Sequence, residues 1–146
     1  MTSIHAITAA DHDEWIRLWN GYLTFYASEV PDDITARTFA RIVDDQLIHG
    51  AIARGDDGRA IGLVHWLTHP ATWSTDDYCY LEDLFVAPDV RGAGVGRALI
   101  AHVTGWAAEH GSAKVYWLTQ EDNTTARRLY DRVAAHTGFT HYEIGL

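Results

Sequence analysis

The sequence predicts a mixed α/β fold in one domain. Three observations carry this prediction: some segments repeat apolar residues at helical spacing, others are short β-branched and aromatic runs, and turn residues separate the two kinds. The chain has 146 residues, which suits one hydrophobic core, and shows no repeat, low-complexity tract or flexible linker that would divide it. We therefore expect a single domain over residues 1–146.

The first half of the sequence predicts a strand, two helices and two further strands. Apolar and aromatic residues recur at helical spacing from Trp15 to Tyr26. Asp11 and Glu14 have the spacing of a capping box, so we expect them to begin this helix, and Pro31 ends it. The predicted elements are a strand at 3–7, a helix between Asp11 and Pro31, a helix at 32–43, and strands at 47–53 and 61–67 joined by a turn at 55–58.

The second half of the sequence alternates strands with helices. A β-branched and aromatic run at 78–86 predicts a strand, and Pro88 stops it. A helix at 94–110 ends at Gly111, since glycine commonly follows a helix C-terminus. The remaining predicted elements are a strand at 114–119, a helix at 123–136 and a closing strand at 139–144.

Composition and charge exclude several classes of protein. The chain has 11 Lys and Arg against 20 Asp and Glu, and this net charge of -9 argues against binding nucleic acid. No apolar run approaches the roughly 18 residues of a membrane helix, and the N-terminal residues do not resemble a signal peptide. A single cysteine, Cys79, fits a reducing compartment. We expect a cytoplasmic protein that binds neither nucleic acid nor membrane, whose carboxylates either attract cationic substrates or maintain solubility.

The most specific pattern is the glycine-rich segment RGAGVGR at 91–97. Glycines before a helix let backbone amides approach a phosphate without obstruction by Cβ. The dinucleotide-binding pattern fails because Arg97 stands where its last glycine belongs, and the Walker pattern fails because no Gly-Lys pair occurs. The pattern R-x-x-G-x-G is satisfied by Arg91, Gly94 and Gly96. The alternative is a glycine-rich turn that binds no ligand.

Two motifs together resemble the GNAT superfamily of acetyl-CoA-dependent N-acetyltransferases. The run YLEDLFV at 80–86, followed by the loop at 91–96, is similar to a strand and loop of that superfamily. This segment is most similar to spermidine/spermine N-acetyltransferases. The second motif, N-x-x-A-x-x-x-Y followed by G-F, is matched within 123–139. The motifs cover roughly residues 78–140, and the order of the predicted elements extends the resemblance to the whole chain.

The resemblance implies a single-domain GNAT acyltransferase fold, in which helices flank a mixed, mostly antiparallel sheet. It also implies acetyl-CoA as co-substrate, no metal, and direct transfer of the acetyl group to an amine in a ternary complex. The glycine-rich loop would hold the pyrophosphate, and the free edge of the preceding strand would pair with the pantetheine arm. The residues expected to bind acetyl-CoA are Leu84, Phe85, Val86, Arg91, Gly92, Ala93, Gly94, Val95, Gly96, Arg97, Asn123 and Tyr130.

Glu82 is the expected base. An alkylammonium acceptor has a pKa of about 10 and must lose a proton before its nitrogen attacks. In a regular strand Glu82 shares a face with Tyr80, Leu84 and Val86, and we expect these neighbours to raise its pKa by desolvation. In the amine acetyltransferases that this segment resembles, the glutamate is the proposed base and acts through water. The alternative for Glu82 is a salt-bridged carboxylate.

Tyr130 is the expected acid. The leaving thiolate needs a proton, and a free phenol, with a pKa of about 10, carries one at neutral pH. Asn123 and Tyr130 lie two helical turns apart and therefore on one helix face. The alternative for Tyr130 is a core tyrosine. The family usually has about one helical turn fewer between this tyrosine and Gly-Phe, so we expect residues 131–137 to lengthen the last helix and alter the final strand.

The resemblance implies that the region of the first helix contributes to the acceptor pocket. The expected substrate-binding residues are Trp19, Tyr22, Tyr26 and Asp83. The aromatic side chains either belong to the core or surround an ammonium group by cation–π contacts, and Asp83 orients the cation. We expect Cys79 to be a packed small residue. His65 and His69 are about 13 Å apart along a strand, too far to share a metal ion.

The leading hypothesis is an acetyltransferase that acts on a small-molecule amine: a polyamine, an amino acid or a related compound. One alternative is an enzyme that acetylates a protein N-terminus or lysine, and another is a non-catalytic acetyl-CoA-binding regulatory module. The presence of both Glu82 and Tyr130 favours an enzyme over the module. By analogy with the family, we expect a homodimer.

Overall fold

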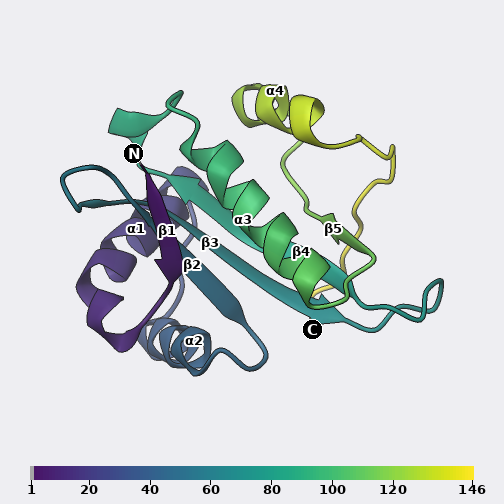
Figure 1. Ribbon diagram of the computed structural model, residues 1–146, viewed down its shortest axis with the longest axis horizontal. Helices are drawn as coiled ribbons and strands as arrows, with labels where there is room; N and C mark the ends of the chain where they lie inside the picture. Colours follow the sequence, from purple (N-terminus) through teal and green to yellow (C-terminus); the bar gives the residue numbers. More distant parts are fainter. Residues whose placement is uncertain (1) are drawn as a thin grey trace. The chain divides into compact units, whose positions relative to one another are not determined.

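The computed structural model describes residues 2–146 and confirms the predicted mixed α/β fold (Figure 1). The chain forms two compact units, Met1–Tyr116 and Trp117–Leu146. The helices and strands of the first unit are β1 (Ser3–Ala6), α1 (His12–Phe25), α2 (Asp32–Asp44), β2 (His49–Arg54), β3 (Ala60–His69), β4 (Tyr78–Val86), α3 (Val95–Glu109) and β5 (Lys114–Tyr116). The second unit contains α4 (Thr124–Val133).

The first unit is built on a five-stranded sheet in the order β1-β2-β3-β4-β5. Neighbouring strands are antiparallel except for β4 and β5, which are parallel. The predicted mixed, mostly antiparallel sheet is therefore confirmed. β4 has the bounds that the sequence predicts, whereas β5 ends at Tyr116 and not at residue 119.

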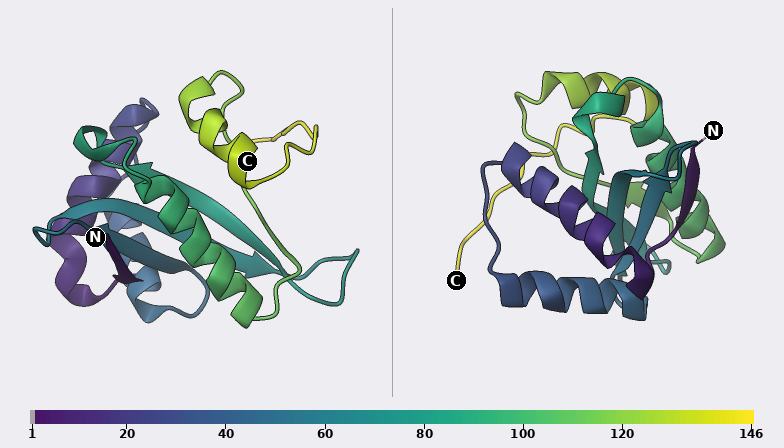
Figure 2. Two further views of the ribbon diagram at one scale, coloured as in Figure 1. Left: turned by 45° about the horizontal axis from the view of Figure 1, so that its top comes forward. Right: turned by 90° about the vertical axis from the view of Figure 1, so that its left-hand side faces the viewer.

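Helices cover both faces of this sheet, with α1 and α2 on one face and α3 on the other (Figure 1, Figure 2). On the α1 side, the rings of Trp15 and Trp19 stack at 5.6 Å, and Phe39 of α2 lies 5.0 Å from Trp15. On the α3 side, Trp66 of β3 packs against Trp106 at 5.5 Å. The helical spacing of aromatic residues in α1 therefore correctly predicts side chains of the core on the α1 side of the sheet.

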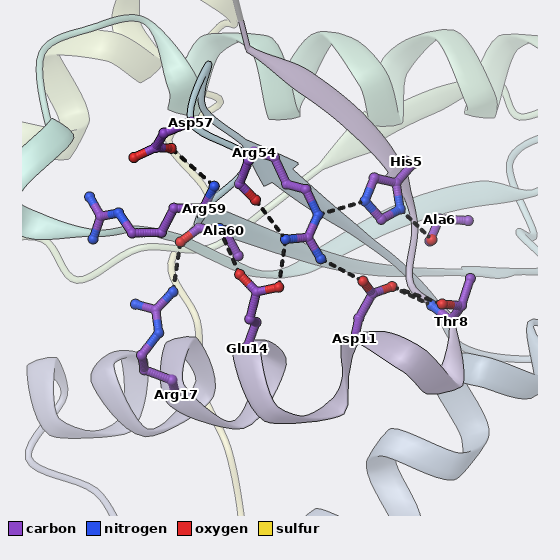
Figure 3. Close-up of polar contacts among 11 residues, drawn as sticks. His5, Ala6, Thr8, Asp11, Glu14, Arg17, Arg54, Asp57, Arg59 and Ala60 are labelled. Atoms are coloured by element: carbon purple, nitrogen blue, oxygen red, sulfur yellow. Dashed lines mark hydrogen bonds and ion pairs between the residues drawn. The ribbon is translucent and has the colours of Figure 1, made fainter.

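A network of ion pairs fixes the start of α1 on the sheet (Figure 3). Arg54 of β2 donates to Asp11 at 2.7 Å and to Glu14 at 2.5 Å. Asp11 also accepts from the Thr8 amide at 2.8 Å, and Glu14 accepts from the Ala60 amide at 2.9 Å. The predicted capping box between Asp11 and Glu14 is wrong, because the Asp11 side chain makes no capping hydrogen bond to α1. Both carboxylates bind Arg54 of β2 and a backbone amide outside α1.

The last helix is shorter than expected. In the second unit α4 ends at Val133, and Ala134 has an extended backbone with φ of −147° and ψ of 174°. The residues from Ala134 to the C-terminus are exposed, so no packing sustains the additional turn, and short helices need such packing. The expectation that residues 131–137 lengthen this helix is therefore wrong.

The closing strand expected at 139–144 is also wrong. Among the described residues this segment pairs with no strand, and the side chains of Phe139, Tyr142 and Ile144 are 85%, 90% and 88% exposed. Alternating apolar residues produce a strand only where a neighbouring edge accepts their backbone hydrogen bonds. The sequence pattern contains the alternation but not the partner.

The helices of residues 2–146 are too short or too polar to cross a membrane. The longest of them, α3, carries Arg97, His102 and Thr104 among its apolar residues. Apolar residues of α3 pack against the sheet, where Leu99 and Val103 are fully buried.

Candidate active site

A β-bulge in β4 sets the geometry of the candidate site. In the pairing of β4 with β3, His65 lies opposite Asp83 and Trp66 lies opposite Leu81, so Glu82 is the extra residue without a partner. Neighbouring residues of β3 face opposite sides of the sheet, and their partners Asp83 and Leu81 therefore do so too. The regular alternation expected for β4 is wrong for this reason.

The bulge divides the side chains of β4 in a way that the sequence pattern did not predict. Asp83 and Phe85 face α1, where the Phe85 ring meets Tyr22 at 6.2 Å. Leu81 and Leu84 face α3 because their partners on β3 do. Glu82 therefore does not share a regular strand face with Leu84. Two adjacent carboxylates, Glu82 and Asp83, are instead presented at the bulge.

Asp83 is held from the core of the first unit. Trp15 Nε1 donates to His65 Nε2 at 3.0 Å, and His65 Nδ1 donates to Asp83 Oδ2 at 2.9 Å. His65 is 1% exposed, whereas the Asp83 side chain is 16% exposed. The Asp83 carboxylate therefore lies at the boundary between the core and solvent, and the buried His65 fixes its position.

Phenol rings surround this carboxylate. Burial raises the pKa of Tyr22 above its usual range, and Asp83 raises it further through its negative charge and a hydrogen bond. Burial and then Asp83 raise the pKa of Tyr26, and burial and then Glu82 raise the pKa of Tyr80. All three phenols therefore stay protonated at neutral pH, and Tyr22 is hydrogen-bonded to Asp83.

Glu82 is exposed to solvent, yet the surrounding protein raises its pKa. Partial desolvation raises the pKa of Glu82, the charge of Asp83 raises it further, and His65 and Arg41 act in the opposite direction. A carboxylate with a raised pKa is a stronger base when ionised. This shift agrees in direction with the one expected from the sequence, and its largest cause is the expected desolvation, to which the charge of Asp83 adds.

The glycine-rich loop ends where α3 begins. Gly92 and Gly94 have φ of +86° and +83°, and a Cβ at either position would meet no atom within 4 Å. The first hydrogen bond of α3 runs from the Ala98 amide to the Gly94 carbonyl at 3.0 Å. The preceding amides at 95–97 therefore lack intrahelical acceptors, and the first turn contains no acidic residue. This open, amide-lined helix N-terminus fits a pyrophosphate.

Arg91 lies between the loop and α1. Its Nε donates to the Val86 carbonyl at 3.1 Å, and its guanidinium lies 5.3 Å from the Phe25 ring and 5.6 Å from the Phe85 ring. It lines a pocket of about 490 Å³ that also includes Arg17. The same pocket is lined by Arg59 and Asp89, whose side chains form an ion pair with each other.

β4 has an open backbone edge between the bulge and the loop. It pairs with β5 only at Tyr78, Cys79 and Tyr80. Within the described residues, no other strand pairs with this side of β4, so the backbone amides and carbonyls at 81–86 that point away from β3 lie on a sheet edge. An extended, amide-containing group can add to such an edge by backbone hydrogen bonds.

The second unit contains the other motif residues. Asn123 precedes α4, and its side-chain amide donates to Thr119 Oγ1 at 3.3 Å. Tyr130 is half-buried, and its ring meets Trp117 edge-on at 5.4 Å. The roles of Asn123 and Tyr130 toward acetyl-CoA stay predictions.

Sequence reasoning missed two residues of the site. From the sequence, His65 stands out only as a possible metal ligand, and Tyr80 only as a neighbour of Glu82. Both acquire their place from the register of β3 against β4, which the bulge shifts and which the sequence pattern does not reveal. Cys79 is buried, and burial raises the pKa of its thiol to about 11, consistent with a packed, unreactive residue.

Comparison with known proteins decides the family. The model of the acetyltransferase (GNAT) family matches residues 12–135. This chain belongs to the GNAT family of acetyltransferases. The resemblance inferred from the strand, loop and helix motifs is confirmed, and so is the expectation of an N-acetyltransferase.

Two curated relatives are similar to this acetyltransferase. D-amino-acid N-acetyltransferase HPA3 of Saccharomyces cerevisiae is 37% identical over 142 residues, which cover 96% of this chain and 88% of that protein. Thialysine N-epsilon-acetyltransferase of Caenorhabditis elegans is 28% identical over 100 residues, which cover 68% of this chain and 61% of that protein.

Solved structures confirm the GNAT fold. AAC(6')-Iy, in complex with the bisubstrate analog CoA-S-monomethyl-acetylneamine, has a TM-score of 0.87 at 21% identity and covers 100% of this chain and 99% of its own. Ribosomal-protein-alanine N-acetyltransferase from Brucella melitensis biovar Abortus 2308 has a TM-score of 0.80 at 23% identity, with both chains fully covered. At these identities the likeness concerns the fold of this acetyltransferase alone.

Proposed function

We propose that this acetyltransferase transfers the acetyl group of acetyl-CoA directly to the primary amine of a small cationic molecule. The observation that carries the proposal is the pair of carboxylates, Glu82 and Asp83, presented by the bulge beside the open edge of β4. An amine acceptor arrives as an ammonium ion, because its pKa is about 10. The carboxylates attract that charge, and the rings of Tyr22 and Tyr26 add cation–π stabilisation.

Acetyl-CoA supplies the acetyl thioester, and the residues around the loop are proposed to hold it. The amides of Val95, Gly96 and Arg97 bind the pyrophosphate at the helix N-terminus, and Arg91 adds a positive charge. The open edge at 84–86 orients the pantetheine arm by backbone hydrogen bonds. In this proposal the pantetheine arm runs along the edge of β4 toward the bulge at Glu82, where the thioester would meet the acceptor.

Glu82 is the proposed base. As a carboxylate it accepts, directly or through water, the proton that the ammonium group must lose. The neutral amine nitrogen then forms a bond to the acetyl carbon while the bond from that carbon to sulfur breaks. Asp83 keeps the acceptor in place, so the two adjacent carboxylates have different tasks.

Tyr130 is the proposed acid. Its phenol gives a proton to the thiolate sulfur that leaves. The proton that the nitrogen loses as the amide forms passes, directly or through water, to the phenolate and restores the phenol. Asn123, on the same motif, is proposed to bind the acetyl-CoA arm. The products are the acetamide of the acceptor and free CoA thiol.

The names of the relatives support an amino acid or a related amine as acceptor. One is a D-amino-acid N-acetyltransferase and the other a thialysine N-epsilon-acetyltransferase, so both act on small molecules that carry primary amines. We propose the same class of acceptor for this chain. The homodimer and the cytoplasmic location expected from the sequence stay predictions.

The experiment is a panel of acceptors with acetyl-CoA and a thiol-release readout. The panel contains D- and L-amino acids, lysine analogues, polyamines and peptides with free N-termini. We expect turnover with a small amine, and we expect Asp83→Asn to raise the acceptor KM while the KM for acetyl-CoA is unchanged. Turnover with peptides alone would contradict the proposal, and acetyl-CoA binding without any turnover would favour a regulatory module.

A further inference from the structure

A chain of hydrogen bonds connects the core to the acceptor site. It begins at Trp15 of α1, passes through His65 of β3 and ends at Asp83 of β4, with distances of 3.0 Å and 2.9 Å. Trp15 is fully buried and His65 is 1% exposed, so solvent does not compete for either of the two inner groups. The three elements that meet here are joined by a polar connection inside an otherwise apolar core.

The first bond of this chain determines where the proton of His65 lies. An indole nitrogen can only donate a hydrogen bond, so the Nε2 of His65 must offer its lone pair to Trp15. The proton of the neutral imidazole is therefore on Nδ1, the atom that faces Asp83 Oδ2. His65 therefore donates its Nδ1–H to the Asp83 carboxylate, while its other ring nitrogen accepts from Trp15.

The imidazole ring is also fixed by packing. Trp15 and Trp19 lie against it, with ring centroids 6.0 Å and 5.6 Å away. On the β2 side, a Cβ at Gly50 would come within 3.2 Å of His65 Cδ2, so the neighbouring strand approaches as closely as glycine allows. A ring flip that exchanged the donor and the acceptor would break both hydrogen bonds at a residue that is only 1% exposed to solvent.

We infer that His65 is a positioning residue of the acceptor site, which as the Nδ1–H tautomer holds the anionic Asp83 carboxylate for the ammonium group of the acceptor. This inference rests on the proposed function. The chemical reason is that a neutral donor orients the carboxylate without cancelling its charge, whereas Lys or Arg in the same place would compete with the substrate cation.

Nitrogen-15 NMR of the histidine side chains tests the tautomer without any activity. At pH 7 the resting protein should show His65 with a protonated Nδ1 and an unprotonated Nε2. A proton on Nε2, or on both nitrogens, would overturn the inference whatever the enzyme acetylates. The chemical shift of the Asp83 carboxyl carbon should differ between the wild type and His65→Leu. An unchanged chemical shift in the folded variant would also overturn the inference.

Two substitutions separate positioning from packing. The side chain of His65→Gln has an oxygen that can accept from Trp15 and an amide that can donate to Asp83, whereas His65→Leu provides neither. We expect His65→Leu to raise the acceptor KM by about tenfold or more, because a hydrogen bond to a charged group is lost, with little change in the KM for acetyl-CoA. We expect His65→Gln to recover most of that loss.

Failure of the inference about His65 and failure of the proposed function give different results. Equal acceptor KM values for wild type, His65→Leu and His65→Gln, all folded by circular dichroism, would show that His65 only fills space. If the wild type acetylates no amine, the proposed function fails. The tautomer and the response of the Asp83 carbon then decide whether His65 positions Asp83.

Discussion

Arg54 Nη2 lies 2.7 Å from Asp11 Oδ1, and this ion pair joins β2 to the residue before α1. Asp11 is 5% exposed, so its charge depends on protein groups for solvation. Burial alone would raise the pKa of Asp11, but hydrogen bonds from the Thr8 amide and from Arg54 outweigh it and lower the pKa. Hydrogen bonds from Arg54 and the Ala60 amide lower the pKa of Glu14.

The first prediction concerns this network. Arg54→Met removes the cation and leaves Asp11 buried without its charged partner, so we expect the free energy of unfolding to fall by about 3 kcal/mol. Urea unfolding at neutral pH measures the change. Arg59→Met is the matched control, because the ion pair of Arg59 with Asp89 is exposed to solvent and should contribute little.

The same network predicts acid sensitivity of the fold. A carboxylate whose pKa is lower in the folded state stabilises the protein above its unfolded pKa of about 4 and loses this contribution as the pH falls below it. The wild type should therefore lose more stability between about pH 5 and pH 2 than Arg54→Met does. Parallel curves for the two proteins would show that Arg54 does not control the titration of Asp11 and Glu14.

The glycine loop gives a prediction about acetyl-CoA. Gly94 has φ of +83°, and a side chain there would enter the open space in front of the helix N-terminus. Gly94→Val should weaken acetyl-CoA binding by more than about tenfold, through steric exclusion of the pyrophosphate and strain in the loop. Calorimetry measures the affinity.

Gly105 provides the control for this substitution. It lies within the same helix, has open space around its Cα and has no positive φ. Gly105→Val should bind acetyl-CoA like the wild type. If Gly94→Val is folded and binds equally well, the pyrophosphate does not bind at this loop.

Glu82 gives a prediction about pH. The pKa of Glu82 is raised above the ordinary glutamate value of about 4.3, so Glu82 becomes protonated at a higher pH than an ordinary glutamate does. As the pH is lowered, activity should therefore fall before ordinary carboxylates are protonated. Glu82→Gln should lower turnover at pH 7 and lose less at high pH, where free amine is abundant. A constant ratio of mutant to wild-type rate from pH 7 to pH 9.5 would assign the proton to another group or to bulk water.

How far the sequence predicts the structure depends on whether a feature is local. The aromatic spacing of α1, the bounds of β4 and the glycine loop follow from residues close together in the chain, and the structure has all of them. The bulge at Glu82 follows from the pairing of β4 with β3, and the partner of Asp83 is a histidine from another strand. No pattern within residues 80–86 contains that information.

The C-terminal errors have the same physical origin. The alternation at 139–144 predicted a strand, and the spacing after Tyr130 predicted another helical turn. Each of these elements requires packing or strand pairing, and the side chains of Phe139 and Ile144 are exposed. Local propensity alone does not maintain either structure.

The last prediction concerns Tyr130 and separates an enzyme from a binding module. Tyr130→Phe removes one hydroxyl and keeps the ring that meets Trp117, so the folded unit should persist. If the hydroxyl gives a proton to the departing thiolate, kcat should fall by about 10²–10⁴, the usual contribution of a general acid. The KM for acetyl-CoA should change little, because the lost interaction forms mainly in the transition state.

Tyr142→Phe makes the same chemical change at an exposed position and should leave kcat unchanged. Single-turnover measurements on both variants, with acetyl-CoA saturating, separate the transfer step from product release. A kcat near the wild-type value in Tyr130→Phe would mean that the thiolate leaves unaided or takes its proton from another donor. Loss of acetyl-CoA affinity together with kcat would instead make Tyr130 a binding residue, since a transition-state interaction leaves ground-state affinity intact.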